Sequence, residues 1–184
     1  DMLCFGGYNF IDNKDNEQDT PYYSFSYLPK DWNKDVFNYT DCIDFINRMA
    51  VSACLTFYKK SFIKKHKIMF PPHLRFEDNI FFCKALIRAK RIAINKTKFY
   101  QRRLHSEQIT QNWDKHFSDY IKITDMLLTM LKKENITVEL YEKYKKSYLK
   151  SCQKINNRFD ESIQNKYNNE LNDLFIKYNF IFLT

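Results

Sequence analysis

Two adjacent carboxylates, Glu77 and Asp78, are the residues of this sequence best suited to acid–base chemistry. They follow the proline pair at 71–72 and open an apolar run with helical spacing that begins at Ile80. Proline fixes its own φ and keeps the preceding residue extended, so a stiff loop should deliver both carboxylates to the start of a helix. Acidic residues in a first helical turn are stabilised by unpaired N–H groups and the helix dipole. The same position at the rim of a cleft suits a general base, and the pattern alone leaves both roles open.

A second group with chemical potential is the basic segment that contains Arg102, Arg103 and His105. Basic loops are commonly solvated surface. Guanidinium groups also bind phosphate oxygens through paired, charge-assisted hydrogen bonds. Histidine is the side chain most often found as a metal ligand. The segment is therefore a candidate for holding a phosphate or one position of a metal shell.

The composition is that of a folded protein with a real core. The chain has 184 residues, of which 44% are hydrophobic and 17% aromatic, and it contains only two glycines. No apolar run approaches the ~20 residues of a membrane span. Five scattered cysteines without CxxC spacing favour reduced thiols in a cytoplasmic protein over a disulfide framework or a zinc site.

Charge is distributed unevenly along the chain. Residues 1–47 hold nine acids and three bases, a net −6, and the remainder holds 13 acids and 27 bases, a net +14. A basic part of this size suits an anionic partner, such as a phosphorylated ligand, acidic membrane headgroups or nucleic acid. Charge by itself does not choose among the three.

Hydrophobic periodicity predicts strands first and helices later. Strands are expected at 3–10 with a bend at Gly6-Gly7, and at 22–28, 51–58, 91–95 and 98–102; helices are expected from Asp41, at 61–66 and at 77–89; and 12–20 is expected to be a polar surface loop. From Trp113 onward, apolar residues recur in steps of three and four, which predicts a helix followed by two more after Val138. The aromatic stripes of these helices indicate a packing core.

Several short motifs occur in an order that resembles one enzyme family. They are LTFYKKSFI at 55–63, FEDNIFF at 76–82 and FYQRRLHSEQIT at 99–110. Their order and spacing resemble the second half of bacterial family 2 glycosyltransferases. The likeness covers about residues 1–130, and the helical segment after Val138 carries no such signature.

The resemblance implies a partial GT-A fold of the α/β class. Within this chain it would be α+β: a small mixed sheet with flanking helices over residues 1–113, then a helical bundle or hairpin over 114–184. In the family, the preceding half binds the nucleotide-sugar donor and ends in a DxD motif that holds Mn²⁺ or Mg²⁺ under the pyrophosphate. No such motif is evident here, and the opening strand looks like the one just after it. The chain is therefore expected to be a fragment without the donor-binding half, inactive alone.

The resemblance also implies roles for individual residues. Asp78 would be the base that accepts the acceptor's proton, and Glu77 would orient or bind the acceptor. Arg102 and Arg103 would contact the diphosphate, and His105 would touch a phosphate or complete the metal shell. The implied reaction is an inverting transfer to a saccharide or lipid-linked acceptor in bacterial surface polysaccharide synthesis, such as capsule or lipooligosaccharide. The expected location is the cytoplasm, where the basic region could also place the protein at the inner face of the cytoplasmic membrane.

Two other function classes fit parts of the sequence. The basic, aromatic helices could form an interaction or membrane-docking module without catalysis of its own, lying on anionic lipid. Charge and aromatics would also suit nucleic acid, but no nucleic-acid-binding motif is present, so no such partner is expected. No pattern in the sequence predicts an oligomeric state.

Overall fold

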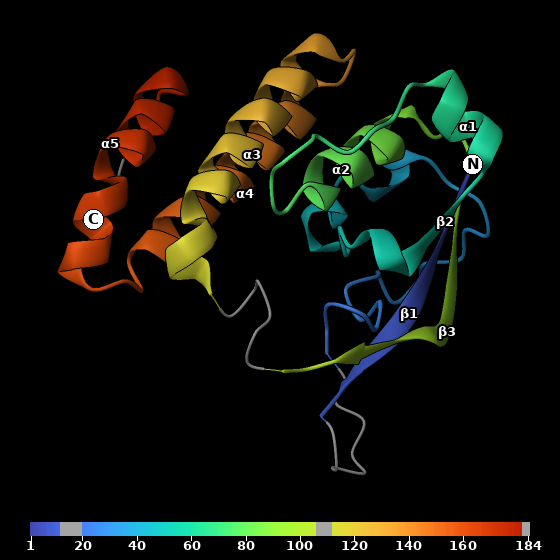
Figure 1. The fold of residues 1–184 in the computed structure, drawn as a ribbon. Coiled ribbons are helices and arrows are strands. Elements are labelled where there is room, and N and C mark those ends of the chain that lie inside the picture. Colours follow the sequence, from blue (N-terminus) through green and yellow to red (C-terminus); the bar gives the residue numbers. More distant parts are fainter. Residues whose placement is uncertain (12–19, 106–111, 182–184) are drawn as a thin grey trace. The chain divides into compact units, whose positions relative to one another are not determined.

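A computed structural model describes residues 1–11, 20–105 and 112–181 of the chain (Figure 1). The chain divides into two compact units. The sheet unit comprises Asp1–Pro71 and Asp78–Ser106, and the helical unit comprises Pro72–Glu77 and Glu107–Thr184. The short loop 72–77 thus belongs to the helical unit, although in sequence it lies between elements of the sheet unit. The fold class is α+β, as predicted.

The sheet has three strands, and its centre is β1 (Met2–Phe10). β2 (Thr56–Tyr58) runs antiparallel along one edge of β1, and β3 (Ile92–Arg103) runs parallel along the other. The predicted small mixed sheet is therefore confirmed. The two strands predicted at 91–95 and 98–102 form a single strand whose register against β1 shifts on both sides of Gly6.

Gly7 is required by the close approach of β3. A Cβ atom built on Gly7 would lie 2.7 Å from the carbonyl oxygen of Tyr100, which is closer than real Cβ contacts come. A side chain here would push against backbone and not against a flexible side chain. The bend or bulge predicted at Gly6-Gly7 is thus confirmed as an irregularity in the β1–β3 pairing.

The strand predicted at 22–28 is wrong, because this segment folds into turns. Tyr23, Phe25 and Tyr27 are buried and the residues between them are exposed, so burial alternates as it would in a strand. The backbone instead bonds to itself: the Leu28 N–H donates to the Phe25 carbonyl (3.1 Å), and Phe25 has φ 55°. Prolines at both ends of the segment limit sheet pairing, since proline has no N–H to donate.

The helix predicted from Asp41 is also wrong. The segment forms two short 3-10 helices, η1 (Tyr39–Cys42) and η2 (Ile46–Arg48). The cap is Asn38, whose side chain accepts the Thr40 N–H, while the Asp41 carboxylate accepts the Asn38 N–H. This reciprocal cap closes a single turn, and Phe45 has left the helical region of φ and ψ before η2 begins.

The buried strand predicted at 51–58 is shorter than expected. Only β2 pairs with the sheet, and it is preceded by a 3-10 turn, η3 (Ala53–Leu55). Both of the other predicted helices of this unit are present, as α1 (Lys60–Lys65) and α2 (Asp78–Arg88). α2 is buried along most of its length, including Phe82, Cys83 and Leu86.

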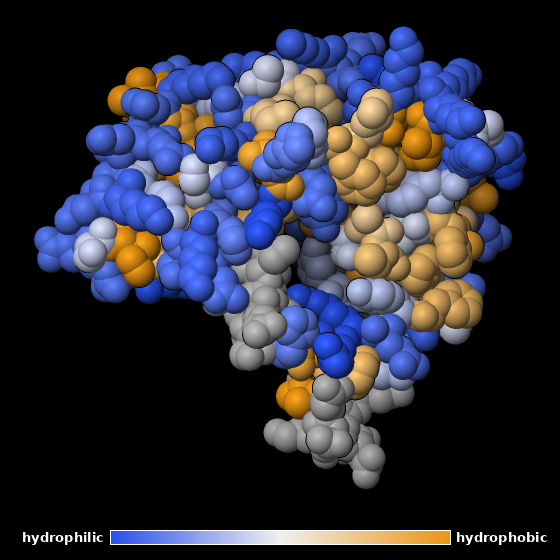
Figure 2. Space-filling view, viewed as in Figure 1, coloured by the Kyte–Doolittle hydropathy of each residue, from blue (hydrophilic) through white to orange (hydrophobic). Residues whose placement is uncertain are grey.

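Large hydrophobic side chains also remain at the surface of the sheet unit. Phe57, Phe99 and Met69 are more than half exposed. Figure 2 shows hydrophobic residues on the visible surface of this unit. Within the sheet, the rings of Phe57 and Phe99 both contact Phe5, at centroid distances of 4.7 and 5.7 Å. The three rings form an aromatic cluster that continues from the interior to the surface.

The helical unit contains three long helices, as the periodicity predicted. They are α3 (Trp113–Lys133), α4 (Val138–Asn156) and α5 (Glu161–Lys177). Their buried residues form the predicted apolar stripes, among them Phe117, Tyr120, Ile121, Leu127, Leu128, Leu131, Tyr144, Tyr148, Cys152, Tyr167, Leu171, Leu174 and Phe175. Thr137 and Asp160 cap α4 and α5 through their side-chain oxygens.

The end of α5 is fixed to α3 by a polar cluster. The Lys177 ammonium lies 2.6 Å from an Asp125 carboxylate oxygen, and the Tyr178 hydroxyl donates to the same carboxylate at 2.7 Å. Across the described ranges, no helix is long and apolar enough to cross a bilayer. Nearly all of the surface loop predicted at 12–20 lies outside the residues described.

Candidate functional site

The candidate base, Asp78, is the first residue of α2 and is half-buried. The side-chain amide of Asn79 donates to an Asp78 carboxylate oxygen at 3.2 Å. A carboxylate in this position gains from the unpaired N–H groups and the dipole of α2. The sequence prediction of a helix opened by the acidic pair is confirmed, although the catalytic role stays a prediction.

The loop that leads into Asp78 has a strained backbone. His73 and Phe76 both have positive φ, 58° and 62°. A bulky residue such as phenylalanine in the left-handed region is a true outlier, and such residues cost on the order of 1–3 kcal/mol each. Outliers of this kind persist only where surrounding contacts fix them, and they concentrate at functional sites.

The contacts that fix this loop lie within the helical unit. The Phe76 ring stacks on Trp113, with 4.6 Å between centroids and 10° between planes, and meets Tyr120 edge-on at 5.4 Å. The Arg75 N–H donates to the Asp119 carboxylate at 3.3 Å. Trp113 was predicted as the start of a helix, and the structure adds that it receives the loop before Asp78. Arg75 thus contacts α3.

Two neighbouring tyrosines connect Asp78 with the basic segment inside the sheet unit. The charge of Asp78 acts on the Tyr22 hydroxyl, and the Arg102 guanidinium donates to the Tyr23 hydroxyl at 3.4 Å. The two tyrosine rings lie 5.3 Å apart. Asp78 is thus near enough to Tyr22 for its charge to affect that hydroxyl, and Arg102, 24 positions later in sequence, contacts the neighbouring Tyr23.

Tyr22 as a whole residue is 40% exposed, although its hydroxyl accepts a hydrogen bond from the Val51 N–H. The pKa of Tyr22 is raised to about 12, mainly by burial and to a smaller extent by the negative charge of Asp78, while the hydrogen bond from the Val51 N–H lowers it. That hydrogen bond is 2.9 Å long. The hydroxyl is thus protonated at neutral pH, with its proton free to be donated to a ligand oxygen.

A pocket opens on the other side of Tyr22. It has a volume of about 360 Å³ and is lined by Pro21, Tyr22, Ser26, Tyr27 and Arg48. Small-molecule sites have volumes of about 300–1,000 Å³ and combine apolar walls with a few polar groups. Tyrosine rings, a serine hydroxyl and one guanidinium suit a ligand with many hydroxyls and apolar ring faces.

Sequence reasoning missed the tyrosines and Arg48 as site residues. It assigned 22–28 to a strand, where alternating aromatics would belong to the sheet. The signal that could have found them is the pair of prolines at 21 and 29, which brackets the aromatic segment as a loop. Loops on a rigid scaffold are where binding residues concentrate.

The other predicted site residues are Glu77, Arg103 and His105, and for these the structure gives the position along the chain and the exposure. Glu77 is half-buried and ends the loop that belongs to the helical unit. Arg103 is the exposed last residue of β3, and His105 is exposed two residues further on. The rest of the predicted tail, 106–110, lies outside the residues described.

A metal site was predicted with His105 as one ligand. In the described ranges, no three or more His, Cys, Asp or Glu side chains are grouped so that they could hold a metal ion. A single exposed histidine is not a sufficient donor set for Mn²⁺ or Mg²⁺, which prefer several oxygen ligands. The described residues therefore do not fit a metal centre by themselves.

The fold of the chain is also found in solved structures. It is shared with Staphylococcus aureus TarS, of which residues 1–349 have been solved in complex with UDP and with UDP-GlcNAc. The TM-scores are 0.59 and 0.64, and the sequence identity is 14% in both cases. The match covers 95% of this chain and 47% and 48% of the two TarS chains, so this chain spans about half the length of those structures.

At 14% identity the likeness establishes the fold. The sequence matches no protein-family profile and no curated protein. The family 2 resemblance therefore stays a prediction based on the motifs at 55–63, 76–82 and 99–110.

Proposed function

We propose that the protein containing this chain transfers a sugar from a nucleotide-sugar donor to a saccharide or lipid-linked acceptor. The observation that carries the proposal is that Arg102 bonds to Tyr23 and that the charge of Asp78 acts on the adjacent Tyr22, in a chain whose fold matches TarS solved with UDP-GlcNAc. A carboxylate and a guanidinium are the two charges that such a transfer needs. The fold supports the reaction class, and the positions of these residues support the assignment of roles.

Asp78 is the proposed base. Its carboxylate takes the proton from an acceptor hydroxyl as the hydroxyl oxygen attacks the anomeric carbon of the donor sugar. The bond between that carbon and the donor's phosphate oxygen breaks, and the electron pair leaves with the nucleoside diphosphate. Attack opposite to the leaving group inverts the configuration at the anomeric carbon.

Arg102 is the proposed stabiliser of the leaving group. Negative charge accumulates on the diphosphate as the bond breaks, and a guanidinium positioned beforehand stabilises that charge without reorganisation. Arg103 and His105 are proposed as further diphosphate contacts, because they follow Arg102 at the end of β3. Glu77 is proposed to bind the acceptor beside Asp78.

The pocket beside Tyr22 is the proposed acceptor site. Its tyrosine rings would cover the apolar face of a sugar, and Ser26, Arg48 and the Tyr22 hydroxyl would bond to its hydroxyls. Donor binding and a divalent cation, Mn²⁺ or Mg²⁺, are proposed to depend mainly on residues outside this chain. The proposed setting is the synthesis of a bacterial surface polysaccharide.

The test is Asp78→Asn in a protein that contains this chain together with its donor-binding part. Asparagine has nearly the same shape and also suits a helix start, so folding should be kept while the base is lost. Turnover with a nucleotide sugar and acceptor should fall by about 10²–10⁴-fold, the usual contribution of general base catalysis. Affinity for the nucleoside diphosphate, measured by calorimetry, should stay within a factor of two or so of the unsubstituted protein.

The matched control is Asp173→Asn, an exposed carboxylate on α5. It removes the same charge by the same substitution and should leave turnover unchanged. If Asp78→Asn keeps normal turnover, the assignment of Asp78 is wrong. If it loses turnover together with its urea-unfolding midpoint, the residue is structural and the base must be sought elsewhere.

A further inference from the structure

Most of α4 and the turn after it carry a concentrated positive charge. Six bases and no carboxylate occur between positions 143 and 158: Lys143, Lys145, Lys146, Lys150, Lys154 and Arg158. Lys146, Lys150, Lys154 and Arg158 follow one another in steps of four, which places them along one face of the helix. All four are exposed.

Within α4, the carboxylate nearest in sequence to this row is Glu142, one turn before Lys146, and it pairs with Lys145. Like charges four residues apart on a helix repel each other and destabilise it. The helix dipole favours cations only in the last turn, which accounts for Lys154 and Arg158 but not for Lys146 or Lys150. An anion outside the helix would relieve the repulsion along the whole row.

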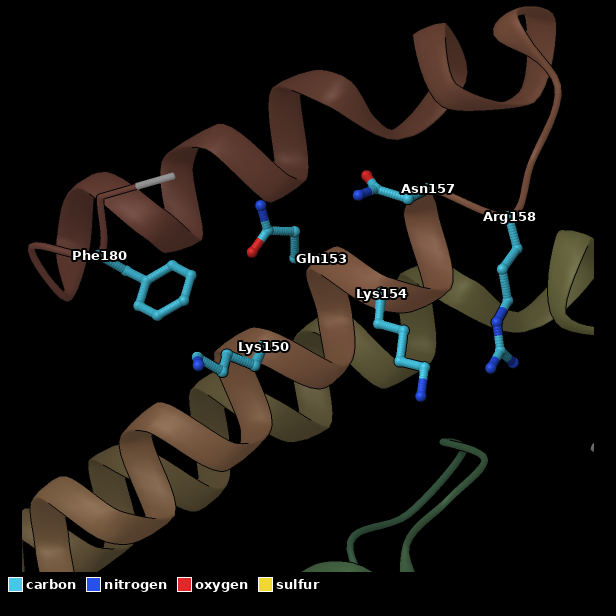
Figure 3. A pocket seen from close by; sticks show the side chains of 6 residues that line it. All are labelled: Lys150, Gln153, Lys154, Asn157, Arg158 and Phe180. Atoms are coloured by element: carbon cyan, nitrogen blue, oxygen red, sulfur yellow. The ribbon is translucent and has the colours of Figure 1, made fainter. Parts of the chain in front are cut away.

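The row borders a hollow within the helical unit (Figure 3). The hollow has a volume of about 560 Å³ and is lined by Lys150, Gln153, Lys154, Asn157, Arg158 and Phe180. In Figure 3 the five side chains of α4 and its final turn follow one another along the helix, and the Phe180 ring lies at the same end as Lys150. Its wall thus offers three cations, two amides and one aromatic ring.

Exposed hydrophobic side chains adjoin the hollow. Phe180 also lines a second depression of about 650 Å³, with Asn172, Phe175, Ile176, Asn179 and Ile181. Ile176 is 75% exposed and Ile181 is 81% exposed. A cationic row therefore continues directly into an apolar edge formed by the end of α5 and the residues that follow.

We propose that this face of the helical unit, the α4 row with Ile176, Phe180 and Ile181, docks on a membrane surface that contains acidic phospholipids. Lysine and arginine are attracted to the phosphates of anionic lipid, and apolar side chains beside them enter the boundary between headgroups and acyl chains. Charge complementarity selects an anionic surface. The exposed isoleucines select lipid over nucleic acid, because a nucleic-acid backbone offers nothing apolar for them to contact.

The proposal is independent of sugar transfer and is tested by binding alone. Co-sedimentation would use vesicles of phosphatidylcholine and vesicles that also contain about a third phosphatidylglycerol. The unsubstituted protein should prefer the anionic vesicles and should lose affinity as salt rises. Lys150→Gln combined with Lys154→Gln and Arg158→Gln should lower the affinity at least tenfold.

The chain offers a matched control in α1. Lys60→Gln with Lys64→Gln and Lys65→Gln removes the same number of exposed charges from the sheet unit and should leave vesicle affinity within twofold. Ile176→Ser with Ile181→Ser tests the apolar edge and should lower affinity at least threefold without changing net charge. Circular dichroism should confirm that each variant keeps its helix content.

Three outcomes would overturn the proposal. Equal losses in the α1 and α4 triple variants would mean that binding follows overall charge. No preference for anionic vesicles at low salt would remove the membrane as partner. A mixed-sequence oligonucleotide that binds as tightly as the vesicles, and loses affinity in the α4 variant, would reassign the row to nucleic acid.

Discussion

The ring of Phe76 lies parallel to the indole of Trp113, with 4.6 Å between their centroids and 10° between their planes. The backbone of Phe76 has φ 62°, a conformation that a bulky residue adopts only under constraint. The two observations are linked, because the aromatic contacts of the Phe76 ring stabilise a backbone conformation that would otherwise relax. Two residues later the chain reaches Asp78.

Substitutions at Phe76 can separate the contribution of the ring contacts to stability from the cost of the strained backbone. Phe76→Ala removes the contacts with Trp113 and Tyr120 but keeps the left-handed penalty, so the free energy of unfolding should fall by about 2–4 kcal/mol. Phe76→Gly removes the same ring and relieves the penalty, so it should be more stable than the alanine variant by about 1 kcal/mol. Urea titration followed by circular dichroism measures both. A glycine variant less stable than the alanine variant would show that the strain is not present.

The two glycines of β1 should respond differently to alanine. In Gly7→Ala the new methyl group would meet the Tyr100 carbonyl oxygen at 2.7 Å, and in Gly6→Ala the nearest atom is the Lys96 carbonyl oxygen at 3.1 Å. Because both neighbours are backbone, Gly7→Ala should lower the free energy of unfolding by about 1–3 kcal/mol or more, and Gly6→Ala by less. Equal effects in thermal unfolding would argue against the close β1–β3 approach at Gly7.

The pocket beside Tyr22 predicts a change in acceptor recognition. Tyr22→Ala and Arg48→Gln should each raise the KM for the acceptor about tenfold with a smaller change in kcat, since they contribute binding and not chemistry. Tyr22→Phe keeps the ring and should have a milder effect. Steady-state kinetics at varied acceptor concentration test this, with the exposed Lys90→Gln as control. Unchanged KM in both pocket variants would place the acceptor elsewhere.

The burial of the cysteines predicts which thiol reacts with a reagent and how the free energy of unfolding changes at alkaline pH. Cys54 is exposed, and the other four cysteines are buried. Burial raises the pKa of Cys4 to about 11 and the pKa values of Cys42 and Cys152 to about 12. At pH 8 a thiol reagent should modify Cys54 quickly and the others only on unfolding. Loss of the fast reaction in Cys54→Ser would confirm the assignment, and two or more fast thiols would contradict it.

The same raised pKa values set the direction of the pH dependence. In the unfolded chain the thiols lose their protons near pH 9, whereas in the folded chain they hold them to about pH 11–12. Above pH 9 the unfolded state therefore binds fewer protons than the folded state, and the free energy of unfolding falls as pH rises. Denaturant titrations at pH 7.5, 9 and 10.5 should show little loss to pH 9 and a marked loss at 10.5. A flat profile over this range would show that the thiols are not buried.

The sequence predicted the elements whose local signals agree with their tertiary environment. The three long helices show a 3.6-residue apolar period and caps at Thr137 and Asp160, and α2 opens at the acidic pair. The strand prediction for 22–28 was wrong because the aromatic residues of this segment alternate in burial without forming a strand. There, tertiary packing of rings overrode the usual link between alternation and sheet pairing.

The candidate site was only partly accessible from sequence. Asp78 and Arg102 could be singled out by type and by motif, but their neighbours Tyr22 and Tyr23 were missed, because the alternating aromatic residues at 22–28 predict a strand and not a binding loop. Arg48 ends the 3-10 helix η2, in a segment that was expected to be one regular helix. Local patterns specify elements, whereas the meeting of separate elements depends on the whole fold.

Because residues 72–77 belong to the helical unit, this architecture cannot be divided into its two units at a single point in the sequence. The chain passes from one unit to the other three times, after Pro71, after Glu77 and after Ser106. Neither unit is a continuous segment, so the helices cannot be exchanged between related proteins as a cassette without also carrying the six-residue loop. Recombination that kept the loop but replaced α3 would leave Phe76 without Trp113, and inheritance of the two parts should therefore be coupled.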